Sequence, residues 1–339
     1  MKPLVITVAA LSLQLALLLA VAQPGAAETI KLGTLAPKGS PWHKAIQDIA
    51  EAWKKDSNGS IRVRIYAGGV SGDEPDMTRK MRIGQLHAAS MTGAGLMSIS
   101  QEIQALQMPM MFRSDQELDY VRERMAPRLE GALAAKGFIV LNWVDAGWVY
   151  FFTKKPVVTL DDLKPLKLFA WVGETAHIGG WRDAGFHPIP LPATEIHTAL
   201  QSGLIQALPT TPIAALSFQW FGQAKHMTDV KWAPLVGATL ITKRKWRRIP
   251  KALRTAMMKT ARVVGNRLQA SIRSLGAKAV EVMKKHGLQV HPVPPSAVSA
   301  WEKGASKAYG SIIGKIVPAD VVAEVERLRD EYRAKQKGR

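Results

Sequence analysis

The side chains that could perform covalent chemistry or hold a metal are few in this chain and do not cluster in the sequence. There are eight histidines and no cysteine, which excludes thiol catalysis, iron–sulfur clusters and cysteine-based zinc sites. No histidine pair has the H-E-x-x-H spacing that places two imidazoles on one face of a helix for zinc. Gly69 to Asp73 begins like a nucleophile elbow but lacks the closing glycine, so we interpret it as a loop. The sequence predicts no catalytic residue, no metal site and no cofactor.

The sequence has alternating strand and helix patterns, and the elements they predict must position any functional site. Strands are indicated by apolar residues with a period of two, and helices by apolar residues three or four positions apart. This alternation is typical of an α/β fold with largely parallel sheets. The predicted strands cover 29–35, 61–66, 87–92, 138–145, 148–153, 167–171, 187–191 and 203–208, and the predicted helices cover 42–56, 74–84, 176–184, 194–202 (with Thr194 as N-cap) and 250–285. At roughly 1.5 Å per residue the last helix would reach about 50 Å, so we expect it to cross two domains.

The first 27 residues have the features of a secretory signal peptide. Lys2 is followed by an apolar run from Leu11 to Ala22, and small residues precede Glu28. This pattern predicts cleavage after Ala27 and export to the periplasm, with an uncleaved membrane anchor as the alternative. Removal of 27 of the 339 residues leaves 312, more than one hydrophobic core usually serves, so two domains are expected.

The chain is strongly basic, with a formal net charge of +19. Its densest basic cluster is Lys243–Arg248, between a predicted strand and the long helix. We interpret this cluster as solvated surface, with contact to anionic headgroups or to a membrane partner as the alternative. Export argues against nucleic acid as a partner.

Two segments resemble the ligand-binding core of the extracytoplasmic solute-binding proteins of TRAP transporters. Leu163–Phe169 corresponds to the D-L-x-G-L-K-I-R strand of that family, and Leu200–Ile205 begins like its A-L-Q-x-G-x-x-D-G-x-x-N segment. Weaker similarities follow in the same order as in the family, in Ile30–Pro41, Asn58–Val63, Arg82–Leu86, Met108–Phe112 and Thr153–Val157. The resemblance therefore covers nearly the whole mature chain.

The resemblance implies a two-lobed periplasmic solute-binding protein of α/β class, with discontinuous domains and a central cleft. Lobe I is expected to comprise 28–152 plus 238–275, and lobe II 153–237 plus 276–339. In this family the lobes close by hinge motion around one small ligand. The receptor then delivers the ligand to a membrane permease with a large and a small integral subunit, and it catalyses no reaction.

The family's binding residues map onto this chain with two departures. The arginine that grips a substrate carboxylate falls on Phe169, so that charged contact is absent. The usual asparagine falls on Thr210, or on Thr211 if the alignment slips by one residue. Other residues expected near the ligand are Trp42, Thr92, Trp143, Trp148 and Trp171.

Several hypotheses remain open for this altered site. The cleft could hold an uncharged, largely apolar ligand between aromatic side chains and hydroxyl groups. It could instead bind a carboxylate through a relocated cation, Lys167 or Arg182. The aromatic side chains could also simply pack the core. Beyond transport, the same closing cleft would suit a periplasmic ligand chaperone or a sensory binding protein.

Overall fold

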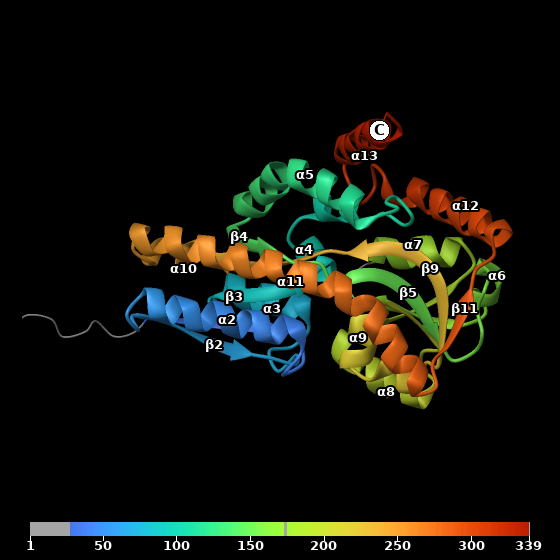
Figure 1. The fold of residues 1–339 in the computed structure, drawn as a ribbon, viewed down its shortest axis with the longest axis horizontal. Coiled ribbons are helices and arrows are strands. Elements are labelled where there is room, and N and C mark those ends of the chain that lie inside the picture. Colours follow the sequence, from blue (N-terminus) through green and yellow to red (C-terminus); the bar gives the residue numbers. More distant parts are fainter. Residues whose placement is uncertain (1–27, 173–174, 339) are drawn as a thin grey trace, which may run out of the picture.

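The computed structural model describes residues 28–172 and 175–338, which form an α/β protein with two separate mixed sheets (Figure 1). Each sheet and the helices packed on it form one lobe. The predicted signal peptide, residues 1–27, lies outside the described residues. None of the helices described is long and apolar enough to cross a membrane.

Lobe I is built on a five-stranded sheet in the order β2-β1-β3-β10-β4. β1 is parallel to β2 and β3, whereas β10 is antiparallel to β3 and β4. The strands are β1 (Glu28–Thr34), β2 (Ile61–Tyr66), β3 (Ala88–Thr92), β4 (Phe138–Trp143) and β10 (Gly237–Thr242). Their helices are α2 (Pro41–Asp56), α3 (Glu74–Arg82), α4 (Gly93–Met97), α5 (Asp115–Ala135) and α10 (Lys243–Arg248), with the 3-10 helix η1 (Gln101–Gln107).

Lobe II is built on a six-stranded sheet in the order β11-β9-β5-β8-β6-β7. The strands are β5 (Gly147–Thr153), β6 (Lys167–Trp171), β7 (His187–Leu191), β8 (Ala207–Thr210), β9 (His226–Leu235) and β11 (Gln289–Pro292). Their helices are α6 (Leu160–Leu163), α7 (Thr175–Asp183), α8 (Ile196–Ser202), α9 (Pro212–Ser217) and α12 (Pro295–Ile312), with the 3-10 helices η2 (Ala193–Glu195) and η3 (Trp220–Gly222).

The expectation of largely parallel sheets holds only in part, since five of the described strand pairs are parallel and four are antiparallel. The antiparallel pairs arise where the chain crosses between the lobes. β4 of the first sheet is followed after three residues by β5 of the second, and β9 of the second is followed after Val236 by β10 of the first. A strand that enters a sheet directly from the other lobe pairs antiparallel with its neighbours here, as β5 does with β8 and β9. The predicted lobe boundary after residue 152 falls inside β5.

The helix α11 (Lys251–Lys285) has 35 residues and crosses both lobes, as expected (Figure 1). It contacts α2 and β4 of lobe I, and α9 and β5 of lobe II. Its buried side includes Met257, Val264, Leu268 and Ile272. At the lobe I end the indole of Trp53 in α2 is buried and donates a 3.0 Å hydrogen bond to the carbonyl of Met257, which fixes α2 against α11.

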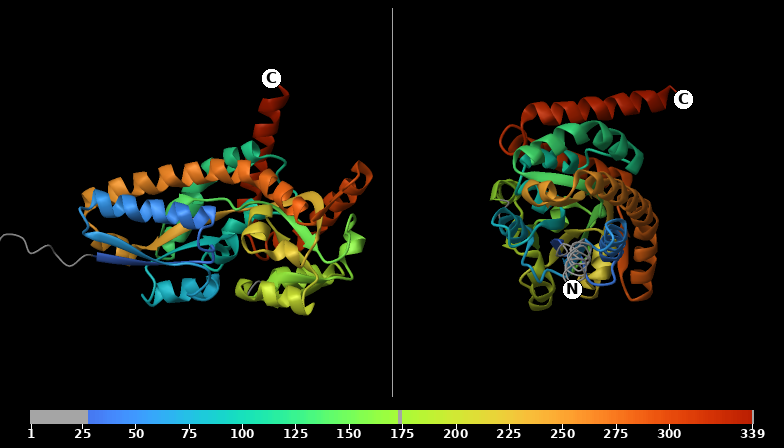
Figure 2. Two further views of the ribbon diagram at one scale, coloured as in Figure 1. Left: turned by 60° about the horizontal axis from the view of Figure 1, so that its bottom comes forward. Right: turned by 90° about the vertical axis from the view of Figure 1, so that its left-hand side faces the viewer.

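The last helix, α13 (Ala319–Lys337), returns to lobe I and lies across α5 (Figure 2). Val321, Val325 and Leu328 are buried in the same apolar cluster as α5 residues such as Met125. The prediction from the sequence placed the whole segment 276–339 in lobe II, whereas α13 packs on lobe I.

Candidate functional site

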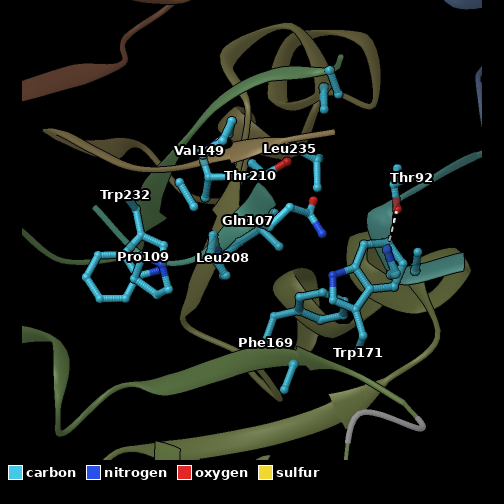
Figure 3. A pocket seen from close by; sticks show the side chains of 18 of the residues that line it. Thr92, Gln107, Pro109, Val149, Phe169, Trp171, Leu208, Thr210, Trp232 and Leu235 are labelled. Carbon is cyan, nitrogen blue, oxygen red and sulfur yellow. Dashed lines mark hydrogen bonds between the residues drawn. The ribbon is translucent and has the colours of Figure 1, made fainter. Parts of the chain in front are cut away.

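A cavity of about 940 Å³ lies between the two sheets. Its walls come from the ends of β1 and β3 in lobe I and from β6, β8 and β9 in lobe II. The last residue of η1, Gln107, and Pro109 in the segment after it also line the cavity (Figure 3). A site shared by two lobes suits a ligand that both lobes must touch.

Aromatic side chains form much of the lobe II wall. Phe169 and Trp171 of β6 meet edge to face, with ring centroids 5.4 Å apart and an interplanar angle of 71° (Figure 3). Phe218 and Trp220 stack with centroids 4.4 Å apart, and Trp232 of β9 lies at another part of the wall. Such surfaces bind apolar or ring-shaped ligand parts by area burial.

A buried acid, Glu74, lies at the lobe I wall. Its carboxylate accepts hydrogen bonds from the backbone N–H of Thr92 (2.7 Å), the hydroxyl of Thr92 (2.7 Å) and the N–H of Gly95 (2.9 Å). Burial nevertheless raises the pKa of Glu74 to about 7, because loss of water disfavours the charged form. Glu74 therefore fixes the β3–α4 junction and leaves little capacity for a ligand.

Gln107 and Thr210 are among the neutral polar residues that line the cavity. The Gln107 side-chain oxygen accepts from the N–H of Val236 (3.2 Å), which turns the amide nitrogen toward the cavity (Figure 3). That nitrogen lies 2.0 Å from where a Cβ on Gly93 would stand, so Gly93 must be glycine for Gln107 to adopt this position. The hydroxyl of Thr210 also lines the cavity, on β8.

Five of the eight sequence-predicted ligand residues line this cavity. They are Trp42, Thr92, Phe169, Trp171 and Thr210. Phe169 is only 2% exposed and belongs to the lobe II core as well as to the cavity wall, so packing and lining are not alternatives for this residue.

The other three predicted residues lie outside the cavity lining. The Trp143 indole donates to Glu130 (3.0 Å) and the Trp148 indole donates to Asp115 (2.9 Å). Thr211 is fully buried and caps α9, where its hydroxyl accepts from the N–H of Ala214 (3.3 Å). Each of these side chains has its polar group engaged in holding an element in place.

The two cations proposed as relocated anchors also lie outside the cavity lining. Lys167 stands exposed at the start of β6, and Arg182 is exposed on the last turn of α7. Among the described residues, the lysines that do line the cavity are Lys164, Lys303 and Lys307, and the lining contains no arginine. Lys164 forms an ion pair with Asp161 (2.7 Å), whereas the other two lie on one face of α12.

Sequence reasoning missed Glu74, Gln107, Trp220, Trp232 and the two α12 lysines. These residues come from segments far apart in the chain, and no local spacing signals that they share a cavity. The one available signal was the acidic pair Asp73-Glu74 at the start of a helix, which is usual for a cap and therefore carries no functional weight by itself.

The lobes also touch directly beside the cavity. Asp73 caps α3 by accepting from the N–H of Glu74 (2.9 Å), and its other oxygen accepts from the N–H of Ala193 in lobe II (3.0 Å). Both atoms are buried among residues of the two lobes, and burial raises the pKa of Asp73. This hydrogen bond exists only while the lobes are close together.

In the described part of the chain no group of three or more histidine, aspartate or glutamate side chains could hold a metal ion. The described cavity lining offers aromatic surface, neutral polar groups, three lysines and the acids Glu74, Asp161 and Asp183.

The chain is similar in sequence to known periplasmic binding proteins. Residues 32–315 match the family of bacterial extracellular solute-binding proteins, family 7. The chain is 23% identical over 322 residues to a C4-dicarboxylate-binding periplasmic protein of Rhodobacter capsulatus, covering 93% of this chain and 96% of that protein. It is 22% identical over 308 residues to the 2,3-diketo-L-gulonate-binding periplasmic protein of Escherichia coli, covering 90% and 91%.

Solved structures of binding proteins share the fold of this chain. A sugar acid binding protein of Advenella mimigardefordensis in complex with galactonate superposes with a TM-score of 0.85 at 19% identity, covering 90% of this chain and 99% of that one. A TRAP periplasmic solute binding protein of Sulfurospirillum deleyianum with bound succinate gives a TM-score of 0.83 at 19% identity, covering 89% and 99%.

Proposed function

The chain belongs to the bacterial extracellular solute-binding proteins of family 7, and from this premise we propose that it captures one small organic solute between its lobes in the periplasm and delivers it to a TRAP-type permease. Members of this family are receptors and not enzymes. The partner would be a permease with a large and a small integral subunit. Cleavage of residues 1–27 would release the receptor into the periplasm.

The ligand is held without the arginine–carboxylate contact that the family resemblance implies. The observation that carries this proposal is Phe169, which occupies the arginine position, is buried and packs edge to face on Trp171. With an aromatic wall, the amide of Gln107 and the hydroxyl of Thr210, the site favours a ligand with a large apolar surface and a few acceptor groups. Neutral donors can orient such a ligand without a buried charge to desolvate.

A second ligand class, an organic acid with a relocated anchor, is favoured by one observation. Lys303 and Lys307 lie one helical turn apart on α12 and both line the cavity. Neither forms an ion pair with a described residue. The named relatives bind acids, such as C4-dicarboxylates and 2,3-diketo-L-gulonate. In this case an apolar body would contact Phe169 and a carboxylate would reach the α12 end.

Closure would use the two strand crossings as hinges. We place the lobe boundaries at 144–146 and at Val236, between strands of different sheets, with 28–143, 237–275 and α13 in lobe I. Lobe II then comprises 147–235 and 276–312. The bond from Ala193 to Asp73 would form on closing, so a ligand that favours the closed state also favours this contact.

The test is a thermal-shift screen of the purified receptor, after native mass spectrometry has identified any retained ligand. Small carboxylates, including succinate and glucuronate, are compared with neutral and aromatic compounds, because a bound ligand raises the melting temperature. Neutral or aromatic compounds are expected to stabilise wild type, and Phe169→Arg is expected to abolish that response. Trp143→Phe, outside the cavity, is the matched control.

The outcomes separate the two ligand classes. A response to aromatic acids that Lys303→Ala/Lys307→Ala removes and Phe169→Arg retains would establish the relocated anchor. A response to succinate alone, unaffected by any of these variants, would refute both proposals for the site while leaving the receptor function intact.

A further inference from the structure

A second surface feature lies on the outer side of α11, away from the cavity. Trp246 of α10 and one face of α11 form a shallow groove, which we call the α11 groove, lined by Trp246, Arg254, Met258, Lys259, Arg262 and Val263. The α11 members stand three or four residues apart, so they follow one face of the helix over about three turns. None of these residues lines the ligand cavity.

The charge around this groove is predominantly positive. Residues 243–280 contain twelve lysines and arginines and no aspartate or glutamate. Acids from other elements reach only part of this set. Glu28 pairs with Lys245 and Arg248, and Glu130 approaches Arg262 at 3.9 Å. Farther along the helix, Arg273 pairs with aspartates. Within the described chain Lys251, Arg254 and Lys259 form no ion pair, so the groove keeps an excess of positive charge.

Arg254 adds an independent observation. Its Nε atom is buried and has no hydrogen-bond partner among the described residues. A buried guanidinium nitrogen without an acceptor is destabilising. Arg254 as a residue is partly exposed at the groove, so an anionic oxygen that draws its guanidinium outward would give this nitrogen an acceptor.

The groove also exposes apolar surface beside the charges. Val263 is 50% exposed, and Met258 is half-buried next to it. A helix face that combines basic side chains with accessible apolar ones is typical of helices that lie on a membrane surface.

We propose that the α11 groove docks the receptor on anionic phospholipid headgroups. The first half of α11 runs along the outside of lobe I (Figures 1 and 2), and its basic residues in the groove share one helix face, so they can meet a surface together. The phosphates pair with Arg254, Lys259 and Arg262, while Val263 and Met258 contact the boundary with the acyl chains. Docking of this kind keeps a soluble receptor close to a membrane while its cavity stays free.

The test measures co-sedimentation of the full mature protein with lipid vesicles. Binding is expected to vesicles of phosphatidylcholine mixed with phosphatidylglycerol, and not to vesicles of phosphatidylcholine alone. Lys259→Glu/Arg262→Glu is expected to weaken binding by roughly tenfold or more, because each basic residue near an anionic surface contributes measurably. Added salt should weaken wild-type binding as well.

The matched control is Lys285→Glu/Lys337→Glu, which changes the net charge by the same amount at exposed positions outside the groove. It is expected to leave vesicle binding within about twofold of wild type. Equal losses in the two variants would show that diffuse charge and not the groove binds the vesicles, and would overturn the proposal. The proposal would also be overturned if wild type failed to bind the vesicles. It would likewise be overturned if the groove variant lost binding to an acidic protein partner but bound vesicles as well as wild type does. Unchanged melting temperatures establish that the variants are folded.

Discussion

Glu74→Gln tests the electrostatics of the cavity wall most directly. The carboxyl pKa of Glu74 is raised from 4.5 to about 7 in the folded protein. A raised folded pKa contributes stability that is fully present below about pH 4.5 and is lost as the pH rises through about 7, and a pKa difference of about 2.5 corresponds to about 3 kcal/mol. Glutamine does not titrate, so the variant lacks this pH dependence.

Glutamine also changes the hydrogen bonds. Its single oxygen can accept from Thr92, but its NH₂ group then faces the N–H of Gly95, and a buried donor without an acceptor costs about 1–3 kcal/mol. We therefore expect Glu74→Gln to be less stable than wild type at about pH 5 and to close most or all of that gap by about pH 8. Chemical denaturation at both pH values measures the difference, with the exposed Glu302→Gln as control.

The refuting result is a penalty for Glu74→Gln that stays constant or grows with pH. It would mean that the three hydrogen bonds stabilise the carboxylate more than burial destabilises it. The folded-state pKa would then lie at or below its ordinary value.

Three further predictions concern closure, the core and export. Asp73→Ala removes the cap of α3 and the contact to Ala193, so it should cost about 1–2 kcal/mol and enlarge the radius of gyration measured by X-ray scattering; an unchanged radius would show that this contact does not hold the lobes. Arg122→Met removes the nearer cation of buried Asp145, at 2.5 Å, and leaves it with Arg273 at 4.0 Å; it should cost about 3 kcal/mol in denaturant unfolding, part of which Asp145→Asn in the same chain should restore. Intact-mass analysis of the periplasmic protein should find an amino terminus at Glu28, and an uncleaved membrane-bound form would contradict the predicted signal peptide.

Periodicity and turn signals predicted about half of the described elements and missed α5, α12, α13, β9 and β10. The strands 61–66, 167–171 and 187–191 and the helix beginning near 250 have the predicted bounds to within one residue. Direction and sheet membership were not predictable in the same way. β5 has the same alternation whichever sheet it joins, and only its pairing with β8 and β9 places it in lobe II.

The N-cap prediction at Thr194 is wrong for a physical reason. The chain makes the 3-10 turn η2 before α8, so Thr194 lies inside a turn and its methyl group approaches Gly69 of lobe I. Contact between the two lobes determines the position of Thr194, and a local capping pattern in the sequence carries no information about that contact.

The candidate site shows the same division between local and tertiary information. Phe169 was identified because a family motif fixes its place on β6. Trp148 and Trp143 were included because they are aromatic and close in sequence, yet their indoles bond to acids of α5. Gln107 had no distinguishing neighbours, and its role depends on a glycine, Gly93, that leaves room for its amide.

The return of α13 to lobe I has a mechanical consequence. Because β1 and α13 both pack on that lobe, lobe II is in effect a long insertion that leaves the first body and comes back to it. Any attachment made through β1 or through α13 immobilises lobe I. Lobe II then makes all of the opening and closing motion. Tension applied between those two elements would load the contact of α13 with α5 and would not pull the cleft open.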